Sequence, residues 1–112
     1  MKTLSQDGKT LDRIRKTFDL SENDLASLLG IQRQSVTGWR EHGVPSSRRA
    51  SVERLSDLAS VLQKEVIASR IPQIVRTPDE WLGGRTMLET IRIEGPEAVY
   101  GYLTRLFRYD AT

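Results

Sequence analysis

At 112 residues, the chain is long enough for one ordinary hydrophobic core or two very small ones, so a second large domain is excluded. It contains no cysteine, which excludes disulfide bonds and cysteine-based metal sites and is compatible with a reducing compartment. No uninterrupted apolar run approaches the roughly 20 residues of a membrane span, and residues 1–10 lack the apolar region of a signal peptide. We therefore expect a soluble cytoplasmic protein without a membrane partner.

The net charge of +2 is too small to indicate a nucleic-acid partner by itself, but the charge is unevenly distributed. Residues 1–70 contain 12 Lys and Arg against 9 Asp and Glu, a net +3, whereas residues 71–112 contain 5 against 6, a net −1. A basic excess attracts phosphate groups, so a nucleic-acid contact is expected in residues 1–70 and should involve few phosphates.

The first two helices are predicted from apolar spacing and from end signals. Residues 1–9 are polar and expected to fray, and a helix is expected to begin at Thr10. A second helix is expected from Glu22, because Ser21 is a favourable N-cap and Asp24 can reach back to the Ser21 amide. The apolar faces of these two helices are formed by Leu11, Ile14 and Phe18 and by Leu25, Leu28 and Leu29.

A third helix is predicted over residues 32–41, directly after a tight turn at Gly30 that can adopt a positive φ. Val36 and Trp39 should face the core, and the opposite side carries glutamine and arginine side chains. In a DNA major groove, arginine can pair with guanine and glutamine with adenine. Gly38 interrupts this helix, either as a tolerated surface glycine or because the backbone approaches DNA closely.

A fourth, long helix is predicted from Arg48 to about Ser69, capped by Ser46 or Ser47 after Pro45. His42, the single histidine, is expected in the last turn of the third helix and is a poor metal or catalytic candidate. Two arginines in the first turn of the fourth helix are candidates for phosphate contacts, against an alternative of solvated surface. The complete set of predicted DNA contacts is Gln32, Arg33, Gln34, Ser35, Thr37, Gly38, Arg40, Arg48 and Arg49.

The combination of Ala26, Gly30, Val36 and Trp39 at these spacings resembles the Xre family of lambda-repressor-like DNA-binding domains. The resemblance implies an all-α fold with a helix-turn-helix that binds double-stranded operator DNA. It is expected to cover residues 1–70.

The remaining residues, 71–112, also read as helical. Pro72 ends the previous pattern, and Thr77 with Pro78 predicts the N-cap and first residue of a short helix that stops at Gly83 and Gly84. Further helices are expected to begin at a capping box formed by Thr86 and Glu89, and at Gly95-Pro96-Glu97. The apolar residues of these two helices are Leu88 and Ile91, and then Val99, Leu103 and Leu106.

The run IVRTPDEWLGGRTMLE, residues 74–89, resembles the toxin-binding domain of Xre/MbcA/ParS-type antitoxins. Met87 stands where this family usually has proline, and Ile74-Val75 where a Trp-Leu pair is common. The resemblance implies a small helical toxin-binding domain at residues 71–112, following the helix-turn-helix bundle.

The family resemblance implies an antitoxin of a type II toxin–antitoxin pair that binds a RES-type, NAD-consuming toxin and represses the shared operon. Aromatic and arginine side chains, which are enriched at interface hot spots, supply the candidate contacts. For Trp81, Tyr102 and Phe107, burial in the core is an equally good interpretation. The candidate toxin-binding residues are Trp81, Arg85, Tyr102, Arg105, Phe107, Arg108 and Tyr109.

The main alternative is a stand-alone dimeric repressor, in which residues 71–112 pair with a second copy and space two reading helices about 34–36 Å apart. As an antitoxin, the chain is expected to form a homodimer or a hetero-oligomer with toxin. An enzyme is disfavoured, because the carboxylates of Asp79 and Glu80 are explained by helix capping and the histidine lacks an orienting partner. No catalytic residue, metal or cofactor is expected.

Overall fold

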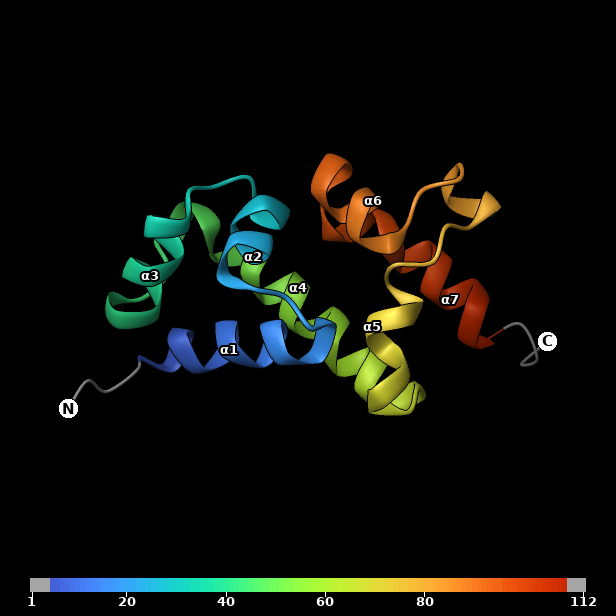
Figure 1. The fold of residues 1–112 in the computed structure, drawn as a ribbon, viewed down its shortest axis with the longest axis horizontal. Coiled ribbons are helices and arrows are strands. Elements are labelled where there is room, and N and C mark those ends of the chain that lie inside the picture. Colours follow the sequence, from blue (N-terminus) through green and yellow to red (C-terminus); the bar gives the residue numbers. More distant parts are fainter. Residues whose placement is uncertain (1–4, 109–112) are drawn as a thin grey trace.

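The computed structural model describes residues 5–108 as helices joined by short connections, without a β-strand in that range (Figure 1). The predicted all-α fold class is confirmed. The α-helices are α1 Gln6–Phe18, α2 Glu22–Leu29, α3 Arg33–His42, α4 Ser46–Glu65, α5 Ile71–Ile74, α6 Met87–Glu94 and α7 Tyr100–Arg108. Three short 3-10 helices are η1 Ala68–Arg70, η2 Glu80–Leu82 and η3 Pro96–Val99.

Helices α1 to α4 form one end of the molecule, and α5 to α7 form the other (Figure 1). Helix α4 passes behind α2 in this view, packs along α1 and reaches the second group, where η3 packs against it. Helix α6 packs beside α2. The second half of the chain therefore lies directly against the first four helices.

One continuous hydrophobic core runs through both halves of the molecule. Phe18 of α1 and Leu58 of α4 are fully buried, as expected from the apolar spacing of those helices. Met87 and Val99 of the second half belong to the same cluster. Burial of this kind stabilises folded proteins by roughly 1.5–3 kcal/mol for each large apolar side chain, so each half contributes to the stability of the other.

Helix α1 begins earlier than the sequence predicts. It starts at Gln6 rather than Thr10, because Ser5 caps it by accepting a hydrogen bond from the Gly8 amide at 2.9 Å. The Ser5 amide and hydroxyl also donate to the carbonyl of Arg40 at the end of α3. Residues 5–9 are thus held by a contact distant in sequence.

The pair formed by α2 and α3 agrees with its prediction almost residue for residue. Ser21 and Asp24 form the expected capping box, and Gly30 ends α2 in the left-handed region with φ of 69°. Helix α3 begins at Arg33 after Gln32, which occupies the N-cap position without a side-chain hydrogen bond. The predicted tight turn at Gly30 between the two helices is confirmed.

Helix α4 departs from its prediction at both ends. Pro45 occupies its N-cap position, so neither Ser46 nor Ser47 caps the helix. The helix ends at Glu65 rather than near Ser69, because Val66 takes an extended conformation with φ −130° and ψ 143°. A β-branched residue favours that region.

In the second half, the predicted cap at Thr77 is wrong. The Thr77 hydroxyl donates to the Gln73 carbonyl, and Asp79 instead caps η2 by accepting from the Trp81 amide. The capping box of Thr86 and Glu89 at the start of α6 is confirmed.

The last predicted helix is divided into two elements. After Gly95 the chain first forms the 3-10 helix η3 and then continues as α7. Val99 and Leu103 are buried as expected, whereas Leu106 is 36% exposed.

Candidate DNA-binding and partner-binding surfaces

The outward face of α3 carries the polar side chains that were predicted to read DNA. Gln32, Arg33, Gln34 and Thr37 are exposed, and Ser35 and Gly38 are half-buried. On the opposite side, Val36 is completely buried, while Trp39 is only partly buried at the edge of the core. The two-sided character of α3 is confirmed, so its donors and acceptors face outward together.

The side chain of Arg33 is largely exposed and makes one ion pair within the protein. Its side chain is 64% exposed, and its Nε lies 3.6 Å from a carboxylate oxygen of Glu22. Glu22 is largely buried and has a closer partner in Arg40, so the longer contact with the solvent-exposed Arg33 contributes only about 0–1 kcal/mol and leaves Arg33 able to contact a nucleic-acid base.

Arg40, which was predicted to contact DNA, forms two ion pairs within the protein. Its guanidinium donates to Glu22 at 2.8 Å and to Asp12 at 3.0 Å, and only a quarter of its side chain is exposed. The hydrogen bond to Asp12 raises the pKa of the guanidinium, and the charges of both carboxylates add to this effect. Arg40 thereby joins α1, α2 and α3.

The two arginines in the first turn of α4 differ in their surroundings. Arg49 donates to both carboxylate oxygens of Asp7 and to the Val44 carbonyl, so its charge is largely satisfied. Arg48 is exposed and makes a single long hydrogen bond of 3.4 Å to the carbonyl of Leu29. Of these two residues, Arg48 is the better placed to bind phosphate.

At the other end of the molecule, Trp81 forms the centre of an exposed aromatic cluster. The indole is half-exposed, and the guanidinium of Arg105 lies 5.7 Å from its ring centroid, which is a cation–π distance. The ring of Tyr102 lies 6.1 Å away, and its hydroxyl donates to Asp79 at 3.2 Å. Burial, followed by the charge of Asp79, raises the pKa of Tyr102. We call Trp81, Tyr102 and Arg105 the tryptophan cluster.

The loop that presents Trp81 is closed by its own backbone. Asp79 and Arg85 form an isolated antiparallel bridge, with the Asp79 amide donating to the Arg85 carbonyl at 3.1 Å. Gly83 and Gly84 both have positive φ, 72° and 84°, which other residues adopt at a cost. The sequence TPDEWLGGRT is therefore explained by a tight loop that projects a tryptophan.

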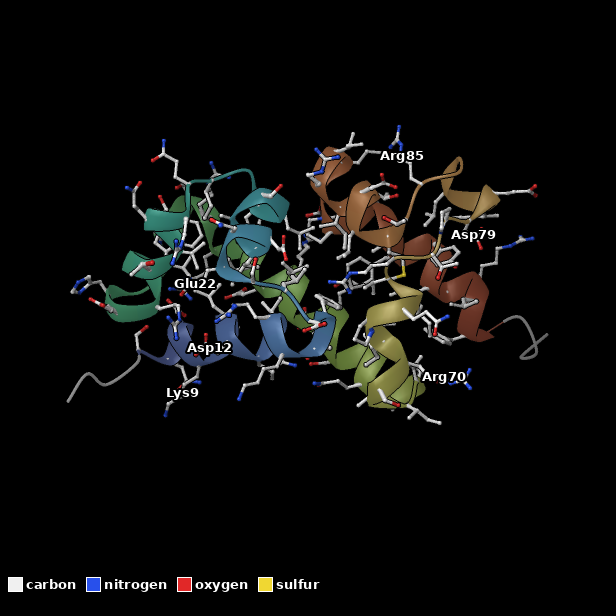
Figure 2. All side chains as sticks on the ribbon, in the orientation of Figure 1. Lys9, Asp12, Glu22, Arg70, Asp79 and Arg85 are labelled. Carbon is white, nitrogen blue, oxygen red and sulfur yellow. The ribbon has the colours of Figure 1, made fainter. Side chains whose placement is uncertain are left out.

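Of the remaining predicted toxin-binding residues, Arg85 and Phe107 lie outside the tryptophan cluster. The side chain of Arg85 points outward (Figure 2) and pairs with Glu94 at 2.6 Å. Phe107 is partly buried against the core. Arg108 ends α7 but its side chain, like the whole of Tyr109, lies outside the described residues.

Two features of the second half were not predicted from the sequence. Ile93 on α6 is a large apolar side chain, yet it is 55% exposed. Arg76 donates to the backbone carbonyls of Phe18 and Asp19, both at 2.7 Å, and so fixes α5 to the end of α1. The residue type alone gave no signal for this contact, since its acceptors lie more than 50 positions away.

The described residues offer little for other chemistry. They contain no group of three or more His, Cys, Asp or Glu side chains that could hold a metal ion. Within the same range, no helix has the length and apolar character needed to cross a bilayer.

By sequence, the chain matches no protein-family model and no curated protein. By fold, it is similar to a chain of the crystal structure of the M. tuberculosis MbcT–MbcA toxin–antitoxin complex, with a TM-score of 0.73 at 14% sequence identity. The similarity covers 94% of this chain and 96% of that chain, so it includes both halves of the molecule. The chain therefore has a small all-helical fold that also occurs in a toxin–antitoxin complex.

Proposed function

We propose that this chain is an antitoxin, a protein that binds and restrains a partner toxin and represses the operon that encodes them both. The observation that carries the proposal is the fold similarity to a chain of a toxin–antitoxin complex over 94% of the length. It is supported by the motif of residues 74–89, within which Asp79 and Arg85 close the loop that exposes Trp81. The proposed role is binding, without catalysis by this chain.

We assign toxin binding to residues 71–112, with the tryptophan cluster at its centre. A half-exposed tryptophan flanked by an arginine and a tyrosine has the composition of an interface hot spot. The partner that we propose is a RES-type, NAD-consuming toxin encoded beside this chain, which rests on the sequence resemblance. Assembly as a homodimer or as a hetero-oligomer with toxin is part of the proposal.

We assign operator binding to residues 1–70, through the outward face of α3. Gln32, Arg33 and Gln34 lie together at the start of that helix and supply donors for both guanine and adenine. Thr37 and Arg48 extend the surface, and Arg40 is left out because its guanidinium is engaged by Asp12 and Glu22. We propose that the chain acts in the cytoplasm, where operator DNA is found.

Co-expression of this chain with the protein encoded by the neighbouring gene, followed by purification through a tag on that protein, tests the proposal. We expect the two to purify together and the complex to bind DNA from upstream of the operon. A chain that binds this DNA as a homodimer but never associates with the neighbouring protein would support the stand-alone repressor instead.

A further inference from the structure

A shallow groove lies where the second half of the molecule meets the α2–α3 turn. Leu29 and Gly30 of the turn form one side, and Arg92 and Gly95 at the end of α6 form the other. Its volume is about 140 Å³, too small for a protein segment. Figure 1 shows the end of α6 beside the end of α2, on the same edge of the molecule as the connection that leads into α3.

Two exposed arginines flank this groove. Arg48 reaches it from α4 by donating to the Leu29 carbonyl, and Arg92 lines it from α6. Both are exposed, and within residues 5–108 neither forms an ion pair. The two halves of the chain thus each place an uncompensated positive charge beside the turn that precedes α3.

The acidic residues closest in sequence to Arg92 are already engaged elsewhere. Glu89 is part of the capping box at the start of α6, and Glu94 pairs with Arg85 at 2.6 Å. Glu97 lies 3.5 Å from Arg54. A position in the last turn of α6 favours a cation at residue 92, but it does not supply a counter-ion.

We propose that Arg92 contacts a DNA phosphate next to the one bound by Arg48, so that the second half of the chain takes part in operator binding. The inference rests on the proposed operator binding by α3. An uncompensated arginine on the edge that carries the start of α3 is complementary to the phosphate backbone. Contacts to phosphate position a protein on DNA without reading its sequence.

The test compares the full-length variant Arg92→Ala with the wild-type chain on two duplexes, one from upstream of the operon and one with the same bases in scrambled order. Binding is measured from about 50 to about 200 mM salt, where each phosphate contact contributes about 0.9 to the slope of log affinity against log salt. We expect Arg92→Ala to lower this slope by about 0.9 and to weaken both duplexes by the same factor. Arg92→Lys should retain the slope, because lysine also binds phosphate.

Arg54→Ala is the matched control, since it removes the same charge from an exposed arginine that already has a carboxylate partner. It should leave the slope unchanged. An Arg92→Ala slope equal to that of the wild type, with the wild type still preferring the upstream duplex, would overturn the inference and leave operator binding intact. A wild-type chain that binds both duplexes equally would contradict operator recognition, while the slope still reports on Arg92. Absence of DNA binding would overturn both.

Discussion

The guanidinium of Arg40 lies 2.8 Å from the carboxylate of Glu22, and this ion pair fastens α3 to the start of α2. The same guanidinium reaches Asp12 on α1, at 3.0 Å. Glu22 is also the carboxylate nearest to the exposed Arg33, at 3.6 Å. Glu22 therefore contacts both Arg40, which holds α3 against α1 and α2, and Arg33 on the outward face of α3.

Substitution of Arg40 is predicted to lower the stability of the fold, whereas substitution of Arg33 is predicted to lower DNA selectivity. Arg40→Ala removes the closest cation from two largely buried carboxylates, leaving Asp12 with Arg15 at 3.4 Å and Glu22 with Arg33 at 3.6 Å, and should lower the free energy of unfolding by roughly 1–3 kcal/mol. Arg33→Ala should change that free energy little, because the Arg33 side chain is exposed and Glu22 keeps its closer ion pair with Arg40, but it should remove the preference for upstream over scrambled DNA. Chemical denaturation and DNA titration measure the two effects. Equal stability of the two variants would show that the Arg40 ion pairs do not support the fold.

Gly8 and Gly38 are predicted to respond to alanine with opposite signs. A Cβ at Gly8 would lie 2.3 Å from the Arg40 carbonyl oxygen, so Gly8→Ala must push α1 away from α3 and should cost about 1–3 kcal/mol. A Cβ at Gly38 meets nothing within 4 Å, so Gly38→Ala should stabilise the protein by about 1 kcal/mol. Thermal unfolding of both variants measures this contrast. The prediction is wrong if the two unfolding temperatures shift in the same direction.

The Gly38→Ala variant also separates the two interpretations of that glycine. Lower DNA affinity with higher stability would mean that the α3 backbone closely approaches DNA. Unchanged affinity would identify Gly38 as a tolerated surface glycine.

Asp7 is predicted to make part of the stability dependent on acid. Hydrogen bonds from Arg49, and then from the Val44 amide, lower the pKa of Asp7 below its ordinary value of 3.8. The stabilisation by Asp7 is therefore complete at pH values above its pKa in the unfolded chain. It is lost as the pH falls through the lower pKa of the folded protein. Asp7→Asn should be less stable than the wild type near neutral pH, and the two should converge in acid. Asp57→Asn is the control, because Asp57 is exposed and accepts no hydrogen bond from the described residues. A constant difference between Asp7→Asn and the wild type at all pH values would contradict the assignment.

Trp81 is predicted to be the main contact with the toxin. Trp81→Ala should weaken the complex by at least roughly 30-fold, corresponding to about 2 kcal/mol for a hot-spot residue. Ile67→Ala is the matched control, because the side chain of Ile67 is more exposed than that of Trp81, at 70%, but lies in the connection after α4. Calorimetric titration of purified toxin gives both affinities. Equal losses in the two variants would place the interface elsewhere.

The sequence predicted those parts of the fold whose causes are local. The capping boxes at Ser21 and Thr86 each need only one partner three residues away, and Gly30 needs only its own positive φ. The apolar spacing of α1 and α4 likewise specified which faces are buried.

The parts that were missed depend on partners that are distant in sequence. Ser5 and Arg40 make their contacts with residues 18 to 35 positions away, and Arg76 reaches back to Phe18. Arg40 has the chemistry of a DNA contact, and its ion pairs with Asp12 and Glu22 could not be inferred from the sequence. The extended conformation at Val66 also lay within an uninterrupted helical pattern.

The most direct measurement is growth of cells that produce the neighbouring toxin together with variants of this chain. We expect the toxin alone to stop growth, and both the wild-type chain and Arg33→Ala to restore it, because the toxin-binding and DNA-reading surfaces are separate. Trp81→Ala, produced at the same level, should restore growth poorly. Failure of the wild-type chain to restore growth, or to bind the toxin, would contradict the proposal that it is an antitoxin.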